Sequence, residues 1–170
     1  GELLPNTLVA DIPTQISGYT PQNFNLTFDG AVPAHRALSR SLNIPSVLML
    51  QDFGVNKFCE ELQRFKLRDI SKSPDHYGLS LILGGAESNL WDLCRTYAGL
   101  SSTVEYFNKN NGNYRTKEFV ELNYDHNFTP DFGSDSKQKT ILGAGVIWQT
   151  YNAMEEVNRP EGDEAWKFYD

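Results

Sequence analysis

A break between two apolar helical patterns, at residues 41–45, is the feature that most constrains the fold of this chain. The sequence there reads Ser41-Leu42-Asn43-Ile44-Pro45. Pro45 fits the first turn of a new helix, where its missing N–H is not needed, and Ser and Asn favour helix ends. The junction therefore predicts one helix over residues 32–40 and a second over residues 44–53, with two short polar side chains held between them.

Further helices are expected on the C-terminal side of this junction. Residues 55–65 carry apolar side chains at helical spacing on one face, namely Val55, Phe58, Cys59, Leu62 and Phe65. Ser88 or Asn89 can cap the next helix, with Asp92 in its first turn. The apolar stripe of that helix is Leu90, Leu93, Cys94, Tyr97, Ala98, Ser101 and Val104. A last helix is expected over residues 138–157, with Pro160 ending it.

The remaining segments are expected to be extended or irregular. Residues 1–30 are rich in Pro, Thr, Asn and Gly, which favours loops with one or two short strands. The apolar run at residues 78–85 fits either a strand or a buried turn of helix. Residues 114–137 predict a long loop or an irregular hairpin, with residues 114–120 as the best strand candidate. The fold class is therefore α+β and predominantly helical.

Composition sets broad limits on function. The chain has 170 residues, 39% of them hydrophobic and 22% charged, which suits one domain with a real core. A net charge of −7 argues against a nucleic-acid partner, which requires clustered Lys and Arg. Cys59 and Cys94 lack metal-ligand spacing and fall at apolar helical positions, so two buried free thiols are expected. No membrane-spanning run or signal peptide is found in the sequence.

Ser41-Leu42-Asn43 resembles the second motif, S-x-N, of the serine penicillin-recognising enzymes. The flanking segments look like the same family in the same order, and the wider match is to bifunctional penicillin-binding proteins of the 1C type. These segments are Asp11-Ile12-Pro13-Thr14, Gly18-Tyr19-Thr20-Pro21-Gln22-Asn23-Phe24, Phe28-Asp29-Gly30, Tyr77-Gly78-Leu79-Ser80-Leu81-Ile82-Leu83-Gly84-Gly85-Ala86-Glu87, Leu90-Trp91-Asp92-Leu93 with Tyr97-Ala98, and Trp166-Lys167-Phe168-Tyr169-Asp170. The last of them is similar to the lead-in to the third motif, K-T-G.

The resemblance implies a function for a parent protein. It implies a D,D-transpeptidase that cross-links peptidoglycan stem peptides, binds penicillins and other β-lactams through an acyl-serine, and uses no cofactor. It also implies a glycosyltransferase domain elsewhere, an N-terminal membrane anchor, and a place at the periplasmic face of the bacterial inner membrane. Carried over by position, Ser41 would join the proton-shuttling network and Asn43 would donate to the substrate carbonyl. The implied fold is the helical lobe of the serine β-lactamase/transpeptidase-like fold.

Two departures from the family pattern limit what this chain can do. Residues 1–40 contain no S-x-x-K, and no K-T-G is present, since Lys139-Thr140 is followed by Ile141. Residues 1–170 are therefore expected to be a single fragment of the transpeptidase domain that lacks both segments and is inactive by itself. Ser134-Asp135-Ser136-Lys137 has the first motif's spacing but a polar setting, and Tyr106-Phe107-Asn108 matches a variant of the second motif by chance.

Other interpretations of the sequence remain open. One alternative is that Ser41 and Asn43 cap the two helices and have no other role. The chain can instead be a non-catalytic cell-envelope module that binds glycan or a protein partner. The three histidines show no ligand or triad spacing, and Trp91 and Trp148 are expected to pack on helix faces. A fragment of the implied fold would leave apolar surface bare, so self-association is also expected.

Overall fold

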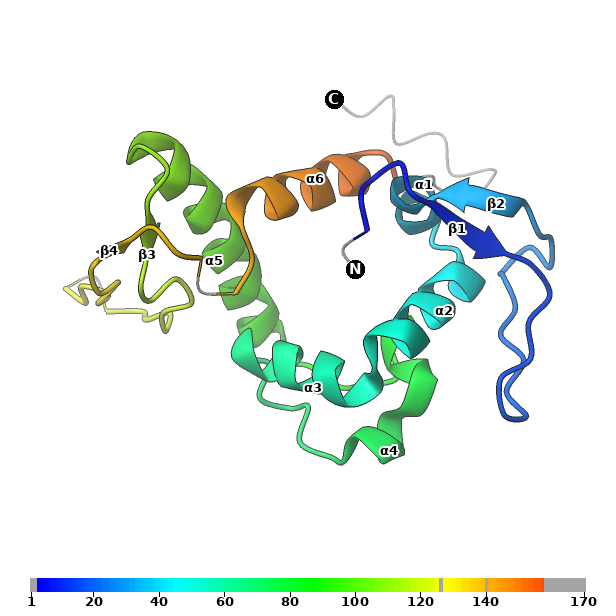
Figure 1. Ribbon diagram of the computed structural model, residues 1–170. Helices are drawn as coiled ribbons and strands as arrows, with labels where there is room; N and C mark the ends of the chain where they lie inside the picture. The colour runs from blue at the N-terminus through cyan, green and yellow to red at the C-terminus, as the bar shows by residue number, and fades with distance from the viewer. Residues whose placement is uncertain (1–2, 126, 140, 158–170) are drawn as a thin grey trace, which may run out of the picture. The chain divides into compact units, whose positions relative to one another are not determined.

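The computed structural model describes residues 3–125, 127–139 and 141–157 (Figure 1). Within these ranges the chain forms two compact units, one of residues 3–48 and 149–157 and the other of residues 49–148. Pro160 and the segment 166–170 lie outside the described residues. No helix in the described ranges combines the length and the apolar character that a bilayer crossing requires.

The first unit is built on a short hairpin followed by a helix. Strand β1 (Leu8–Asp11) pairs antiparallel with β2 (Gly30–Pro33), and helix α1 (Ala34–Ser39) follows at once. The small core of this unit consists of the buried residues Val32, Ala37 and Leu42, with Val9 packed against them. The strand expected among residues 1–30 is confirmed, and it supplies the surface on which α1 and the next junction rest.

Two consecutive helices follow the junction. Helix α2 (Asn43–Phe53) and helix α3 (Val55–Arg64) match the expected helices closely. Gly54 separates them with a φ of 93°, a conformation that L-residues with a Cβ rarely adopt. The helical period of residues 55–65 is therefore confirmed, and a single glycine accounts for the break between α2 and α3.

The second unit has the larger core. Its buried members come from α2, α3 and the segment that follows α3, and they are Leu50, Cys59, Leu67, Ile70, Tyr77 and Leu81. Helix α4 (Pro74–Tyr77) leads directly into the 3₁₀-helix η1 (Gly78–Leu83). Of the two alternatives left open for residues 78–85, the helical turn is the one observed. It places Leu81 in this core, where the side chain is buried.

Helix α5 (Leu90–Lys109) has its polar face buried and its apolar face exposed. The cap by the Asn89 side chain is confirmed, because it accepts from the Asp92 N–H at 2.8 Å. The buried positions are Asp92, Arg95, Gly99 and Thr103. The apolar stripe faces outward, with exposed fractions of 76% for Leu90 and 47% for Tyr97. Cys94 lies on this stripe, so its expected burial is wrong, whereas Cys59 is buried as expected.

The segment after α5 is an irregular hairpin that holds the start of the last helix. Strand β3 (Tyr114–Arg115) pairs with β4 (Asp135–Ser136), so the expected strand over 114–120 is too long. Helix α6 (Ala144–Glu155) begins later than expected. The reason is local: Tyr114 Oη accepts from the Ala144 N–H at 3.1 Å, and the Gly143 carbonyl accepts from Val146 and Ile147.

Gly99 provides a test of how α5 packs. A Cβ at Gly99 would lie 2.4 Å from Cδ1 of Phe119, whereas a Cβ at Gly145, a helical glycine of α6, would meet nothing within 4 Å. We expect Gly99→Ala to destabilise the fold by about 1–3 kcal/mol through overpacking. Gly145→Ala should be neutral or stabilise it by up to about 1 kcal/mol. Urea unfolding followed by far-UV circular dichroism measures both, and equal effects would contradict the packing described.

Candidate functional site

Helix α1 ends in a motif that places Ser41 in the left-handed conformation. The N–H of Ser41 donates to the carbonyl of Leu38 at 3.0 Å, and the N–H of Leu42 donates to that of Ala37 at 2.9 Å. These two bonds form a Schellman motif, and Ser41 takes the position, with a φ of 52°, that glycine usually fills. The chain therefore reverses sharply between α1 and α2.

The middle residue of Ser41-Leu42-Asn43 anchors the junction and turns its neighbours outward. Leu42 is 6% exposed and packs with Ala37 and Val32. Ser41 is exposed, and its hydroxyl makes no hydrogen bond with any described residue. Asn43 is half-buried, and its Nδ2 donates to the carbonyl of Gln22 at 2.8 Å. The two residues that flank Leu42 thus differ: within the described part of the chain the Ser41 hydroxyl has no partner, whereas the Asn43 amide is held by Gln22.

The first turn of α2 is satisfied by a side chain from far along the sequence. Oδ1 of Asn23 accepts from the N–H of Asn43 at 3.0 Å and of Ile44 at 3.3 Å, and Pro45 has no N–H to satisfy. Asn23 in turn donates to the carboxylate of Asp11 at 2.7 Å. Sequence pattern assigns neither Asn23 nor Asp11 a role of its own, because contacts across 12 and 20 residues leave no periodic signal.

The chemistry available at this junction is limited. The hydroxyl of Ser41 can donate and accept, and the Asn43 amide keeps a second N–H and its carbonyl oxygen for another partner. The nearest basic side chain in the sequence, Arg40, is paired with Asp29. A general base that would activate a serine is not among these groups. The arrangement can orient a substrate or relay a proton, but it does not generate a nucleophile.

The other serine and asparagine motifs lie in different settings. Ser134 and Lys137 are exposed at the β4 hairpin, where the Ser134 N–H donates to Thr116 Oγ1 and Lys137 Nζ donates to the Asn111 carbonyl. They do not open a buried apolar helix, as a nucleophile motif would. Tyr106, Phe107 and Asn108 lie within the last turn of α5. Neither segment contributes a group to the hydrogen bonds that hold the Ser41 junction.

A cavity of about 300 Å³ lies between α5 and the segment after β3. Arg95, Ser102, Glu118 and Phe132 are among its lining residues, and Ser41 and Asn43 are not. Across the described ranges, no three His, Cys, Asp or Glu side chains gather in a way that would hold a metal ion. The cavity adds no reactive pair to the chemistry at the junction.

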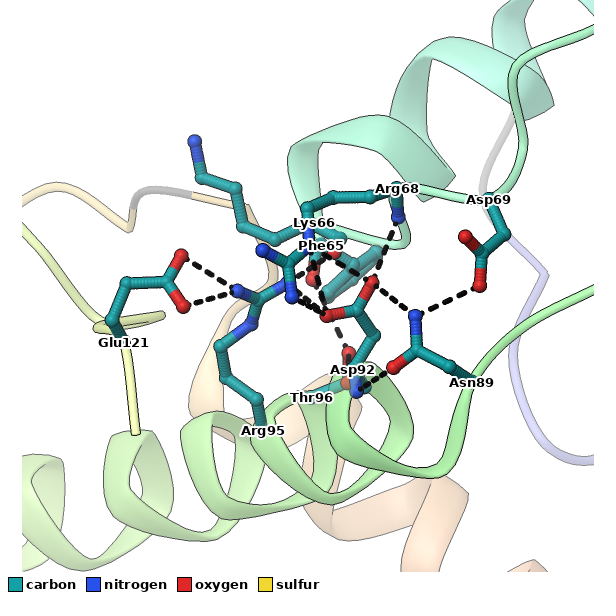
Figure 2. A network of polar contacts seen from close by, with 9 residues as sticks. All are labelled: Phe65, Lys66, Arg68, Asp69, Asn89, Asp92, Arg95, Thr96 and Glu121. Atoms are coloured by element: carbon teal, nitrogen blue, oxygen red, sulfur yellow. Dashed lines mark hydrogen bonds and ion pairs between the residues drawn. The ribbon is translucent and has the colours of Figure 1, made fainter. Parts of the chain in front are cut away.

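A network of polar contacts surrounds Asp92 at the start of α5 (Figure 2). Its carboxylate is fully buried and accepts from Arg68 Nη2 at 2.7 Å, from the Arg68 N–H at 3.0 Å and from Arg95 Nη2 at 3.0 Å. Asn89 Nδ2 donates to it at 3.1 Å. Arg95, only 1% exposed, also pairs with Glu121 at 2.7 Å.

The role of this network is to hold the fold together. The hydrogen bonds from Arg68 are the main cause that holds the pKa of the Asp92 carboxyl well below its usual range, and Asn89 and Arg95 act in the same direction. A permanently ionised carboxylate that is enclosed by two guanidinium groups is neither an acid nor a nucleophile at neutral pH. It fixes α5 against the segment after α3, because Arg95 Nη2 also donates to the carbonyl of Lys66.

Comparison with known proteins shows which proteins this chain is similar to in sequence. Over 101 residues, 59% of the chain, it is 35% identical to penicillin-binding protein 1C of Escherichia coli (strain K12). The chain is related to the penicillin-binding proteins. It is also 27% identical over 153 residues to penicillin-binding protein 1F of Bacillus subtilis (strain 168). The resemblance to the penicillin-binding proteins of the 1C type is thereby confirmed, although no protein-family model matches the chain.

The fold agrees with this relationship. The crystal structure of penicillin-binding protein 1A from Haemophilus influenzae superposes on 79% of the chain with a TM-score of 0.55 and 23% sequence identity. The chain therefore has part of the transpeptidase-type fold, in its predominantly helical portion, as expected. It spans 13% of the 1C relative, 20% of the 1F relative and 18% of the 1A structure. The roles of Ser41 and Asn43 stay predictions.

Asp92 offers a pH-dependent test of the network. Asp92→Asn leaves the buried Arg95 without a full counter-charge, and we expect a loss of about 3 kcal/mol or more in the free energy of unfolding. Because the folded-state pKa is lowered, the stabilisation is complete above the usual value of 3.8 and is lost as the pH falls from there toward the folded pKa. The difference between wild type and variant, measured by urea unfolding, should be constant above about pH 5 and shrink below it.

The control lies on the same helix. Glu105 pairs with Lys109 at 2.6 Å, and both side chains are more than half exposed. Glu105→Gln should therefore change the free energy of unfolding by less than about 0.5 kcal/mol. An Asp92→Asn effect as small as that of the control, or one that grows at acid pH, would contradict the assignment.

Proposed function

We propose that this chain is the part of a serine D,D-transpeptidase domain that carries its second motif, with Ser41 as the proton-relaying hydroxyl and Asn43 as the donor to the substrate carbonyl. The observation that carries the proposal is the junction itself. An exposed hydroxyl without a partner among the described residues lies two positions before an amide held by Gln22. Residues that served only as helix caps would direct these groups to the backbone of α2, but Asn23 already performs that task.

The parent protein would cross-link the stem peptides of peptidoglycan through an acyl-serine and would be acylated by β-lactams. It would require no cofactor. As the family resemblance implies, the parent would also contain a glycosyltransferase domain and an anchor in the inner membrane, with this segment on the periplasmic side. Relatedness to the penicillin-binding proteins supports this proposal.

The chain alone would not perform the reaction. Acyl transfer requires a serine nucleophile with a base in reach. The S-x-x-K spacings at residues 134–137 and 136–139 both lie at the β4 hairpin, where Lys137 and Lys139 are exposed. Lys137 is bonded to a backbone carbonyl, and the Ser136 hydroxyl is bonded to the backbone of Gln138. We infer that the nucleophile and the K-T-G strand belong to other segments of the parent, and that residues 1–170 are one fragment of its transpeptidase domain.

A binding module for glycan or for a partner protein is the competing function. It would predict that Ser41 and Asn43 are caps without chemistry. The full-length gene product separates the two proposals, because S-x-x-K upstream of Gly1 and K-T-G shortly after Asp170 are required by the first and not by the second.

Acylation by a fluorescent penicillin tests the proposed roles. In the full-length gene product, Ser41→Ala should lower the acylation rate on the order of 100-fold, because general acid–base assistance is lost. Ser17→Ala is the matched control, since Ser17 is also exposed and has a positive φ of 45°. It should leave the rate unchanged. The chain of residues 1–170 should take up no covalent label, and labelling at Ser41 or Ser134 would refute the proposal.

We also propose that the isolated chain self-associates through the exposed stripe of α5. Leu90, Leu93, Cys94 and Tyr97 recur at the i, i+3, i+4 and i+7 positions of one helix face, and Leu93 is 39% exposed. Because the ion network holds the opposite face inward, the stripe cannot turn inward without exposing Asp92 and Arg95. A second copy offers the same apolar surface, and pairing of the two would remove both from water.

Cys94 makes this association measurable. It is exposed on the stripe, whereas Cys59 is buried, so mild oxidation of concentrated chain should give a dimer linked through Cys94. Leu90→Glu should abolish both the dimer and the concentration-dependent mass in light scattering. Leu26→Glu, at a residue 68% exposed outside the stripe, should leave both unchanged. A strictly monomeric mass at high concentration would contradict the proposal.

A further inference from the structure

Beneath the Ser41 junction lies a buried polar pair, Asp11 and Asn23. Asp11 closes strand β1 and has no exposed surface, and Asn23 is 2% exposed. Asn23 Nδ2 donates to Asp11 Oδ1 at 2.7 Å and to the carbonyl of Thr27 at 3.0 Å. Both hydrogens of the amide group are thereby engaged, and the orientation of the amide is fixed.

The fixed amide presents its oxygen to α2. Oδ1 of Asn23 accepts from the N–H groups of Asn43 and Ile44, which are the first donors of that helix. Asn43 is tied a second time to the same loop, since its Nδ2 donates to the carbonyl of Gln22. The backbone and the side chain of Asn43 are thus both held by residues 22–23.

Asp11 also reaches the end of α1. Its second oxygen, Oδ2, accepts from the N–H of Asp29 at 2.9 Å, and the carboxylate of Asp29 pairs with Arg40, the residue before Ser41. One carboxylate therefore connects the two sides of the junction through short chains of hydrogen bonds. Within the described residues it has no cationic partner, which makes its burial costly unless the hydrogen bonds are kept.

We propose that Asp11 and Asn23 are positioning residues for the second motif, acting through Asn43 and through Arg40, the residue before Ser41, and never touching substrate. The inference rests on the function proposed above. In physical terms, the fixed amide of Asn23 holds the first turn of α2 in one position, and this restricts the Asn43 side chain to one orientation.

The donor and acceptor pattern permits a rescue design. Asn23→Asp sets two buried carboxylates against each other, and Asp11→Asn turns an amide N–H toward either the Asn23 amide or the Asp29 N–H. The double variant Asp11→Asn/Asn23→Asp restores a donor facing an acceptor at both ends. Its carboxylate at position 23 still accepts from the first N–H groups of α2, but the Thr27 carbonyl then faces a carboxylate oxygen in place of an N–H donor.

The experiment uses the full-length gene product and a fluorescent penicillin at saturating concentration. Each single variant should lower the first-order acylation rate of the folded protein on the order of 10- to 100-fold with little change in apparent affinity, as misplacement of a catalytic group does. The swap should recover part of that rate, because the two facing acceptors at Thr27 remain unfavourable. Asp92→Asn is the control for lost stability, and it should leave the acylation rate of the folded protein unchanged.

A second measurement separates this inference from the proposed function. Amide hydrogen exchange at Asn43 and Ile44 in the chain of residues 1–170 should accelerate in Asn23→Ala and return toward wild type in the swap. If the wild-type parent is not acylated, the proposed function is wrong. The exchange data then test by themselves whether Asp11 and Asn23 hold the first turn of α2. If the swap restores neither exchange nor acylation, or if Asp92→Asn lowers the acylation rate as strongly, the positioning role is wrong.

Discussion

The buried carboxylate of Asp92 decides which face of α5 is inside. Arg68 and Arg95 both donate to it, and Arg95 is itself 1% exposed. Removing one partner from such a cluster strands a charge in a medium that solvates it poorly. Rotating α5 to bury its apolar stripe would carry Asp92 and Arg95 to the surface and break their hydrogen bonds to Arg68 and to the Lys66 carbonyl. The exposed Leu90, Leu93 and Tyr97 are therefore a consequence of the network.

The same principle operates at two helix starts, those of α5 and α2. Asn89 caps α5 with its own oxygen and bonds Asp92 with its nitrogen, and Asn23 caps α2 while bonding Asp11. In each case an asparagine bridges the N-terminal N–H groups of a helix to a buried carboxylate. An amide suits this task because it is donor and acceptor at once. The helices are placed by polar contacts as much as by the apolar cores.

Sequence reasoning reaches the features that depend on local pattern. The period of residues 55–65, the cap at Asn89 and the junction at Pro45 are set by neighbours within one helical turn. Sequence reasoning fails where the residue that a side chain contacts lies far along the sequence. Periodicity locates the stripe of α5 but does not say which face is buried, which is why the expected burial of Cys94 is wrong.

The same limit applies to the strands and to the polar pair beneath the junction. Strand β3 is short because Gly133 and Thr116 alter the pairing beyond Arg115. Asp11 and Asn23 find their partners only when the hairpin and α2 come together, so neither residue carries a signal in the sequence.

A residue in the left-handed conformation after a helix does not by itself indicate a functional site. Helix α3 ends as α1 does: the Lys66 N–H donates to Gln63 and the Leu67 N–H to Leu62, with a φ of 66° at Lys66. The two ends differ in the segment that comes next. After Lys66 the chain is tied by its backbone to Arg95, whereas after Ser41 a second helix starts at once, and its first residue, Asn43, has its amide held by Gln22. That difference in the following segment, and not the strain, is what separates the end of α1 from the end of α3.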